Sequence, residues 1–174
     1  MPSDAVGYLI LRTAVAFVYL YAGWLNTRDA AARQWTVDHT AILFRKTPWA
    51  HSMRLHRAAA ATGMAMMIGG GASLLLGAEP RLGALALAVF TSLGITIHHR
   101  ERNEARVRLE SWGASGDPAA IALGWSAFAG HQSSWIKNVG LIGACLFVFF
   151  AGGGPDFSIL TDILGGWLGL RNTP

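Results

Sequence analysis

Charged residues and cysteine are both scarce in this sequence. Only 14% of its 174 residues are charged and 52% are apolar, whereas a soluble globular domain has about 25% charged residues. This composition disfavours a soluble protein. The single cysteine, Cys145, cannot form an internal disulfide or a CxxC redox pair. It is expected to be a small apolar packing residue, and any dithiol chemistry would need a partner protein.

Motifs for catalysis and metal binding are also missing. The sequence has no Ser/His/Asp grouping, no glycine-rich phosphate loop, no carboxylate dyad and no HExxH pattern. The histidines include no pair at i,i+4 spacing, so no metal site and no cofactor of its own are predicted. They are His39, His51, His56, His98, His99 and His131. Whether the protein takes part in catalysis is left open; at most it would be a subunit of an oxidoreductase.

Four apolar stretches are long enough to cross a lipid bilayer. They cover about residues 7–25, 57–78, 81–99 and 136–154, and a hydrocarbon core of about 30 Å needs about 20 helical residues. The stretches are apolar all round, whereas the helices of a soluble bundle have an apolar stripe and a charged face. The sequence therefore predicts an all-α fold, with residues 1–174 forming a single membrane domain built as a four-helix bundle.

The basic residues are unevenly divided between the two sides of such a bundle. Eleven of the fourteen lie in the two long connections, which share one side of a four-span chain. They are Arg28, Arg33, Arg45, Lys46, Arg54, Arg57, Arg100, Arg102, Arg106, Arg108 and Lys137. The positive-inside rule places these connections in the cytoplasm and both termini outside the cell (inner) membrane. The basic character then reflects topology and attraction to anionic lipid, and no nucleic-acid partner is predicted.

Amphipathic segments are predicted at the membrane surface, in the long connections and in the C-terminal tail. Residues 29–35 are expected to be helical and to lie in the interface. Residues 100–108 are expected to extend the third helix beyond the membrane, followed by a break at 113–118 and a separate short helix at 121–128. Residues 156–170 have an apolar stripe at helical spacing, which predicts a tail on the outer surface or docked on a partner.

Arg12 is the one charged residue clearly inside a predicted span. An ionisable side chain at that depth is costly and usually faces protein or water. Three roles are open: an ion pair with a carboxylate, snorkelling of the guanidinium to the interface, or contact with a substrate or quinone. The candidate carboxylates are Asp4, Glu79, Asp156 and Asp162.

Small residues recur at every fourth position of the second predicted span. They are Ala61, Ala65, Gly69, Ser73 and Gly77. Such a ridge lets two helix backbones approach closely, which is a main route to helix association in lipid. The ridge predicts a packing surface, either against the third span or against another membrane subunit.

The order of these features resembles the DoxX-like family of small four-helix membrane proteins. The resemblance covers about residues 8–160 and rests on short segments in the same order. They are Leu11–Thr13, Tyr21–Asn26, Met66–Gly70, Leu74–Gly77, Arg81, Ala84–Ala88, His98 or His99, Lys137–Asn138 and Phe157–Ile159. The chain departs from the family pattern at three positions, where Asn26 replaces a favoured Lys, Met66 a favoured Glu and Leu160 a favoured Asp. These departures remove groups that could move protons inside the bundle.

The resemblance implies a role in quinone-dependent thiosulfate oxidation or other thiol or sulfur redox work, often beside a soluble partner. Two functions therefore compete. The favoured one is a non-catalytic accessory subunit that packs against a larger respiratory or photosynthetic membrane complex, because the chain keeps the packing pattern and loses the acids. The alternative is a membrane subunit of a quinone-linked oxidoreductase, with the quinone at Arg12. A small transporter is disfavoured, since paired broken helices are not visible.

Overall fold

The computed structural model describes residues 3–151, which contain helices and no strands. Helix α1 spans Ser3–Thr27, α2 Ala30–Ala41, the 3-10 helix η1 Ile42–Phe44, α3 Met53–Leu76, α4 Pro80–Ser115 and α5 Pro118–Ala151. Four of these helices are long and apolar enough to cross a membrane. The predicted all-α architecture with four spans is confirmed. The predicted amphipathic tail, residues 156–170, lies outside the described residues.

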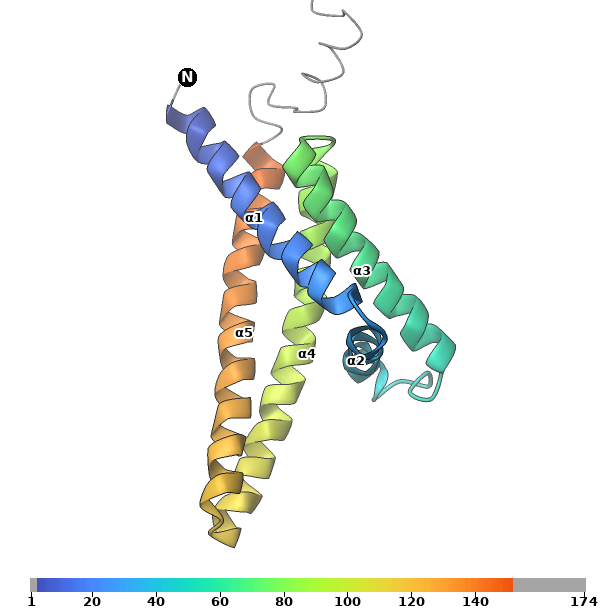
Figure 1. The fold of residues 1–174 in the computed structure, drawn as a ribbon, viewed down its shortest axis with the longest axis vertical. Helices are drawn as coiled ribbons and strands as arrows, with labels where there is room; N and C mark the ends of the chain where they lie inside the picture. Colours follow the sequence, from blue (N-terminus) through green and yellow to red (C-terminus); the bar gives the residue numbers. More distant parts are fainter. Residues whose placement is uncertain (1–2, 152–174) are drawn as a thin grey trace, which may run out of the picture.

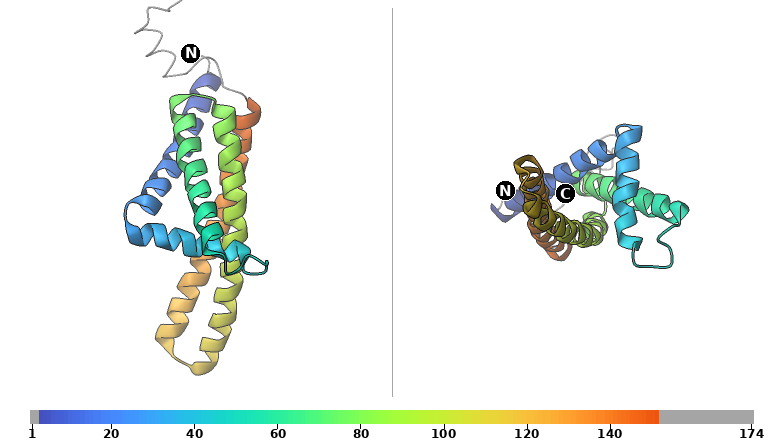
Figure 2. Two further views of the ribbon diagram at one scale, coloured as in Figure 1. Left: turned by 90° about the vertical axis from the view of Figure 1, so that its right-hand side faces the viewer. Right: turned by 90° about the horizontal axis from the view of Figure 1, so that it is seen from below.

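The long helices run side by side and give the molecule two different ends. The start of α1, the α3–α4 turn and the end of α5 lie together, and we call this the terminal end (Figure 1). At the opposite end, α4 and α5 continue as a hairpin well past α2, which lies across the bundle (Figure 2). We call this the charged end, and define it as α2, η1 and residues 98–136. Both long basic connections contribute residues to it.

Helix α2 is fixed at its start and is not part of the core. The Asp29 carboxylate accepts a hydrogen bond from the Ala32 amide at 2.8 Å, which caps the first turn. None of the residues of α2 is buried. A helix with this orientation and exposure fits the interfacial segment predicted at 29–35, although it continues to Ala41.

The hairpin of α4 and α5 is longer than a bilayer requires. The two helices contain 36 and 34 residues, whereas about 20 cross the hydrocarbon core. The predicted extension of the third span is confirmed, and the break falls at Gly116, whose φ of 70° ends α4 in the left-handed conformation. The separate helix predicted at 121–128 is wrong, because α5 runs unbroken from Pro118. Proline is favoured at the first position of a helix, and isolated glycines within a helix are tolerated.

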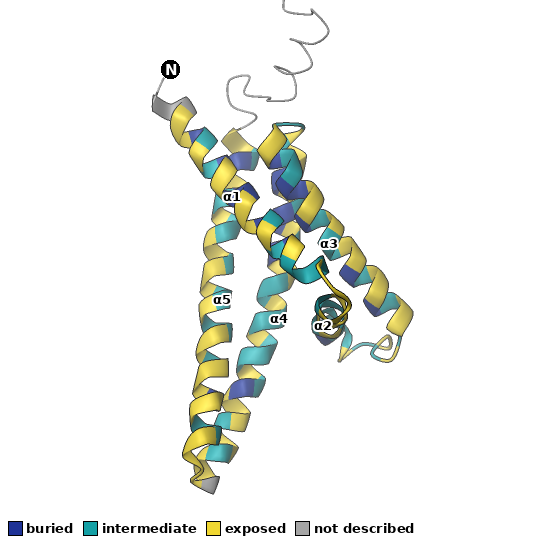
Figure 3. Ribbon diagram, viewed as in Figure 1, coloured by how far each residue is buried: buried dark blue, intermediate teal, exposed yellow. Residues whose placement is uncertain are grey.

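The buried core lies at the terminal end, where α1, α3, α4 and α5 meet (Figure 3). It consists of Tyr8, Val15, Ala16, Tyr19, Met67, Leu74, Ala84, Leu87, Ala88, Cys145 and Val148. In the hairpin, by contrast, Ala105 and Gly124 are the only buried residues among those described between 101 and 136. The two ends therefore differ in packing as well as in charge.

Two glycines of α3 set the spacing of the core helices. A Cβ atom at Gly70 would lie 2.9 Å from the carbonyl oxygen of Gly83 in α4. A Cβ atom at Gly71 would lie 3.3 Å from the carbonyl oxygen of Ala16 in α1. Helix α3 thus meets both neighbours almost backbone to backbone, as expected for helices that associate in lipid.

Candidate functional site

The small-residue ridge of α3 does not form one packing surface. Ala61, Ala65 and Gly69 are exposed, and a Cβ atom at Gly69 would meet no atom within 4 Å. The Ser73 hydroxyl instead donates to backbone carbonyls of the α3–α4 turn, and Gly77 ends α3 in the left-handed conformation. The first three positions are left to face lipid or another subunit.

Arg12 is enclosed in the terminal end, with only 1% of its surface exposed. Its guanidinium carbon lies 6.0 Å from the centre of the Tyr8 ring, the outer limit of a cation–π contact. This enclosure does not fit snorkelling, which would carry the guanidinium to the surface. Two of the candidate carboxylates, Asp156 and Asp162, lie outside the described residues. An ion pair and a contact with quinone both stay predictions for Arg12.

A buried chain of hydrogen bonds joins α5, α1 and α4 beside this core. The Cys145 thiol donates to the Tyr19 oxygen at 3.9 Å, and the hydroxyl groups of Tyr19 and Thr91 are hydrogen-bonded. Thr91 in turn donates to the Leu87 carbonyl at 2.6 Å. The burial predicted for Cys145 is confirmed, at 0% exposure. Each hydroxyl or thiol proton has an acceptor, so this group is well suited to hold three helices in register.

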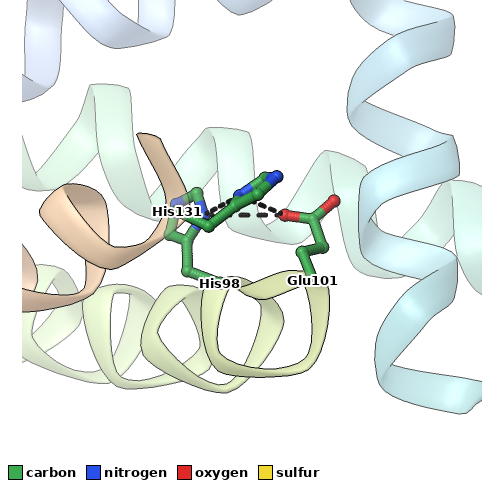
Figure 4. A group of neighbouring side chains, drawn as sticks. All are labelled: His98, Glu101 and His131. Carbon is green, nitrogen blue, oxygen red and sulfur yellow. Dashed lines mark hydrogen bonds and ion pairs between the residues drawn. The ribbon is translucent and has the colours of Figure 1, made fainter. Parts of the chain in front are cut away.

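An ionisable cluster occupies the charged end, where Glu101 of α4 lies between histidines of three helices. His39 Nε2, from α2, lies 2.8 Å from Glu101 Oε1. His131 Nδ1, from α5, lies 3.2 Å from Glu101 Oε2, and His98 Nδ1, from α4, lies 3.6 Å from the same oxygen. The two Nδ1 atoms are 3.4 Å apart. Figure 4 shows the His98, Glu101 and His131 side chains pointing toward one another.

The residues on either side of Glu101 fix it to the neighbouring helices. Arg100 donates to two carbonyls of η1, at 2.6 and 3.2 Å, and so ties the end of α2 to α4. Arg102 donates to Gln132 Oε1 at 3.0 Å and ties α4 to α5. Three consecutive residues of α4 therefore contact three different elements. This arrangement explains how histidines far apart in sequence reach one carboxylate.

Burial and charge act in opposite directions on the cluster, which lies on the polar extension of α4, past its apolar part. The Glu101 side chain is only 12% exposed. Burial raises the pKa of Glu101, but His39 and His98 beside it, with the charges of His39 and His131, outweigh burial and hold it below its ordinary value. Burial lowers the pKa of His131, against the charge of Glu101, which raises it. The arrangement therefore favours an ionised Glu101, to which His39 is the histidine at the shortest distance.

An apolar cavity of about 510 Å³ adjoins the cluster between α2, η1, α3, α4 and the end of α1. Phe44, Phe90 and Leu93 form part of its apolar wall, and His39 and His98 lie on its polar side. Volumes of about 300–1,000 Å³ with apolar walls and a few polar groups are typical of small-molecule sites. The cluster is thus placed at the edge of a pocket that could hold a ring-shaped apolar ligand.

A second cavity, of about 320 Å³, reaches the same cluster. Glu101 and His131 line it together with charged residues such as Arg45, Glu104 and Arg108. The cluster therefore borders two cavities, the apolar one through His39 and His98 and the more polar one through Glu101 and His131.

Three of the six histidines do not join this cluster. His51 and His99 are exposed. His56 is buried, and its ring stacks on Phe44 with 5.3 Å between the ring centres. Only three of the six histidines, His39, His98 and His131, therefore lie around Glu101.

The sequence contained a partial signal for the cluster. His98 and Glu101 are three residues apart, a spacing that puts two side chains on one face of a helix. His39 and His131 have no such relation to Glu101, because they come from helices brought together only by the tertiary fold. The mixed charges of residues 100–108 predict a solvated helix extension, and no local feature of the sequence marks Glu101 as buried.

More than half of the chain matches a known family. The sequence model of a family described as DoxX matches residues 7–100. This region contains Arg12, His39 and His98, and it ends one residue before Glu101. No curated protein and no solved structure matches the chain.

Proposed function

This chain belongs to the DoxX family and is a multi-pass membrane protein, and from this premise we propose that it binds a quinone beside His39 as the membrane subunit of a quinone-linked oxidoreductase. The observation that carries the proposal is the cavity of about 510 Å³, whose apolar walls are interrupted by a few polar groups such as His39, His98 and Arg100. A quinone has the matching form, since its flat ring is apolar and its two carbonyl oxygens need hydrogen-bond donors.

His39 has the right chemistry and position to supply protons to such a ligand. Reduction of a quinone to a quinol consumes two electrons and two protons, and histidine transfers protons effectively near neutral pH. His39 lines the cavity, and its Nε2 lies 2.8 Å from Glu101 Oε1. A proton that His39 gives to a quinone oxygen is replaced from solvent, because the His39 side chain is 23% exposed. The ionised Glu101 carboxylate beside it holds the imidazole in place at the edge of the apolar cavity.

The two electrons must come from a partner protein. The sequence has a single cysteine, Cys145, and it is buried in the core. It cannot by itself pass through a dithiol–disulfide cycle, which requires two thiols. The donor class that the family resemblance implies is a thiol or sulfur compound oxidised by a soluble partner. In this proposal the chain holds the quinone and supplies its protons, and the partner supplies the electrons.

The position of the cavity suits a ligand that arrives through lipid. Phe90 and Leu93 belong to the apolar part of α4, whereas His98 and Arg100, which also line the cavity, stand where this part gives way to charge. A quinone bound at this level has its ring beside polar groups and its isoprenoid tail among apolar side chains and lipid. Arg12 is not among the residues that line this cavity, so a quinone at Arg12 would be a separate site.

Photolabelling with an azido-quinone tests the proposal on the detergent-purified protein. Mass spectrometry is expected to find the label on α2, η1, α3 or α4, and an unlabelled short-chain quinone should compete with it. Gly63→Leu adds a side chain on the cavity wall and is expected to weaken labelling about tenfold, equivalent to about 1.4 kcal/mol. Gly69→Leu is the matched control, because Gly69 lies on the same helix and a Cβ atom there meets nothing.

Two outcomes would contradict the quinone site. One is labelling of Gly63→Leu at wild-type strength, and the other is label confined to peptides away from the cavity. Label on peptides around Arg12 would indicate that the quinone binds beside that residue instead.

A non-catalytic accessory subunit is the second candidate, favoured by the outward ridge of α3. Ala61, Ala65 and Gly69 are exposed on the helix surface, and exposed small residues on membrane helices are a common contact surface for other helices. In this alternative a larger respiratory or photosynthetic complex packs on the ridge. Ala65→Leu, with Gly69→Leu beside it, would then abolish co-purification of the complex in a fixed ratio. Unchanged co-purification from native membranes would count against it.

We also place the charged end on the cytoplasmic side of the cell (inner) membrane, because basic residues of both long connections lie there. Ser111, near the tip of the hairpin, is exposed, whereas the native Cys145 is buried. Ser111→Cys is expected to react with a membrane-impermeant maleimide only after cells are opened. Reaction in intact cells would reverse the orientation.

A further inference from the structure

We propose that His98, Glu101 and His131 form a binding site for a divalent transition-metal ion, for which zinc is the best fit. The three donor atoms, Nδ1, Oε2 and Nδ1, come from α4 and α5 and all lie within 4.8 Å of one another. Figure 4 shows them converging from the two helices. The proposal goes beyond quinone binding and does not depend on it. It departs from the expectation of no metal, which rested on the absence of a local sequence motif.

The separations of the three atoms fit a tetrahedral ion. They are 3.2, 3.4 and 3.6 Å, so an ion about 2.1 Å from each atom, a usual length for Zn–N and Zn–O bonds, lies about 0.7 Å out of the plane of the three atoms, as a tetrahedral ion does. Ligand atoms around a tetrahedral ion with such bonds are about 3.4 Å apart, whereas those of an octahedral ion are about 3.0 Å apart. The observed distances match the tetrahedral value. Magnesium and calcium, which prefer six or more oxygen ligands, fit less well.

One unsatisfied atom in the cluster, Glu101 Oε2, also calls for a cation. Among the described residues, Glu101 Oε2 is buried and accepts no hydrogen bond, although His131 Nδ1 is 3.2 Å away, because that contact is not aligned as one. The Nδ1 atoms of His98 and His131 face each other at 3.4 Å. When both are unprotonated, they are two lone pairs without a donor between them. An ion at the centre satisfies all three atoms at once, and two imidazoles with one carboxylate are a donor set that zinc accepts.

His39 supports this site without belonging to it. Its Nε2 lies 2.8 Å from Glu101 Oε1, the oxygen that faces away from the other two histidines. An outer contact of this kind fixes a ligating carboxylate and tunes its affinity for the metal. Glu101 and His131 also line the cavity of about 320 Å³, which gives water access to the fourth position of the ion. Three protein ligands with an open fourth position are typical of catalytic zinc.

Metal titration of the protein, purified in detergent without a histidine tag, tests the assignment. A chelator first removes any bound metal, and zinc is then added back. The wild type is expected to retain about one zinc per chain through gel filtration, measured by plasma mass spectrometry. His131→Ala and Glu101→Gln should each weaken zinc binding by more than about tenfold. His99→Ala is the matched control, because His99 is adjacent to His98 in sequence but exposed. Its zinc content should equal that of the wild type.

Cobalt substitution makes the test independent of whether the variants fold. Tetrahedral Co²⁺ absorbs visible light strongly and octahedral Co²⁺ only weakly, so the wild type loaded with Co²⁺ is expected to turn intensely coloured. His39→Ala leaves all three donor atoms in place and should weaken binding about 10–100-fold without abolishing it. The proposal is overturned by a wild type that retains no zinc, by a weak octahedral cobalt spectrum, or by full zinc binding in folded His131→Ala and Glu101→Gln.

Discussion

The terminal end and the charged end of this protein use their polar residues in opposite ways. At the terminal end, the Cys145–Tyr19–Thr91 chain is buried and every proton in it has an acceptor. At the charged end, Glu101 has histidines around it and an oxygen that accepts no hydrogen bond among the described residues. It lines one cavity, and its neighbours His39 and His98 line a second. A satisfied network stabilises a fold, whereas partly satisfied groups beside a cavity are typical of a functional site.

The packing of the two ends follows the same division. Helix α3 approaches α1 and α4 at Gly70 and Gly71 so closely that no larger side chain fits without movement. The hairpin at the charged end has few buried residues and depends on contacts such as Arg102 to Gln132. The comparison assigns stability to the terminal end and the proposed chemistry to the charged end. Substitutions should therefore separate stability from activity according to the end they affect.

The largest effect is expected from His39→Gln at the charged end. Glutamine keeps an N–H donor for Glu101 but cannot transfer a proton, and general acid–base catalysis contributes about 10²–10⁴-fold to rates. Quinol formation in membrane vesicles containing the native partner should fall about 100-fold, while azido-quinone labelling and thermal stability stay close to wild type. A variant with normal turnover would show that His39 does not supply the protons.

Gly70→Ala at the terminal end is expected to have the next largest effect, on stability alone. The added methyl group would lie 2.8 Å from the Leu87 side chain and 2.9 Å from the Gly83 carbonyl oxygen, and overpacking of this kind costs about 2 kcal/mol. Gly69→Ala, one residue away and outward-facing, should leave stability unchanged or raise it by up to about 1 kcal/mol. Unfolding midpoints in mixed detergent measure both, and equal midpoints would contradict the close approach of α3 and α4.

Tyr19→Phe is expected to cost less, about 1 kcal/mol. The substitution removes the hydroxyl that links Cys145 to Thr91, but Thr91 keeps its bond to the Leu87 carbonyl. Tyr21→Phe is the control, since Tyr21 is 53% exposed. The same unfolding assay applies, and a Tyr19→Phe protein as stable as the control would show that the buried chain does not hold the helices.

The smallest effect is expected from Arg106→Ala, on the hairpin surface. Its Nε lies 3.1 Å from Glu110 Oε1, but the two side chains are 71% and 64% exposed. An exposed i,i+4 pair contributes about 0.3 kcal/mol and is screened by salt. The unfolding midpoint should therefore barely move, and it should equal that of the wild type at high salt. A loss as large as that of Tyr19→Phe would mean that ion pairs hold the hairpin.

Features that depend on local sequence were predicted well. The apolar stretches predicted the spans, and the alternating charges after His98 predicted the extension of α4. The ridge of α3 was read correctly as small and regular, but its direction was not predictable. Rotation of a helix depends on its neighbours, and it is Gly70 and Gly71 that face them. A period of four residues does not tell whether the ridge faces the neighbouring helices or the outside of the bundle.

The candidate site was much harder to predict, for a physical reason. Its carboxylate looks like any charge on an exposed helix, and only the packing of α2 and α5 against α4 buries it. Glu101 gains His39 from one side and His131 from the other, and no rule of spacing connects residues on separate helices. Glu101 also lies just past the end of the predicted span 81–99, so it does not stand out as a charge inside the membrane.

The length of the α4–α5 hairpin has a consequence for what can meet this protein. Thirty-six residues of α4 extend about 54 Å, whereas a bilayer with its headgroups is about 40–45 Å thick. About 10 Å of helix therefore stands clear of the lipid, which exceeds the Debye length of about 8 Å in physiological salt. Charges at the tip near Gly116 are screened from the anionic surface, and a soluble protein can reach them without touching the membrane.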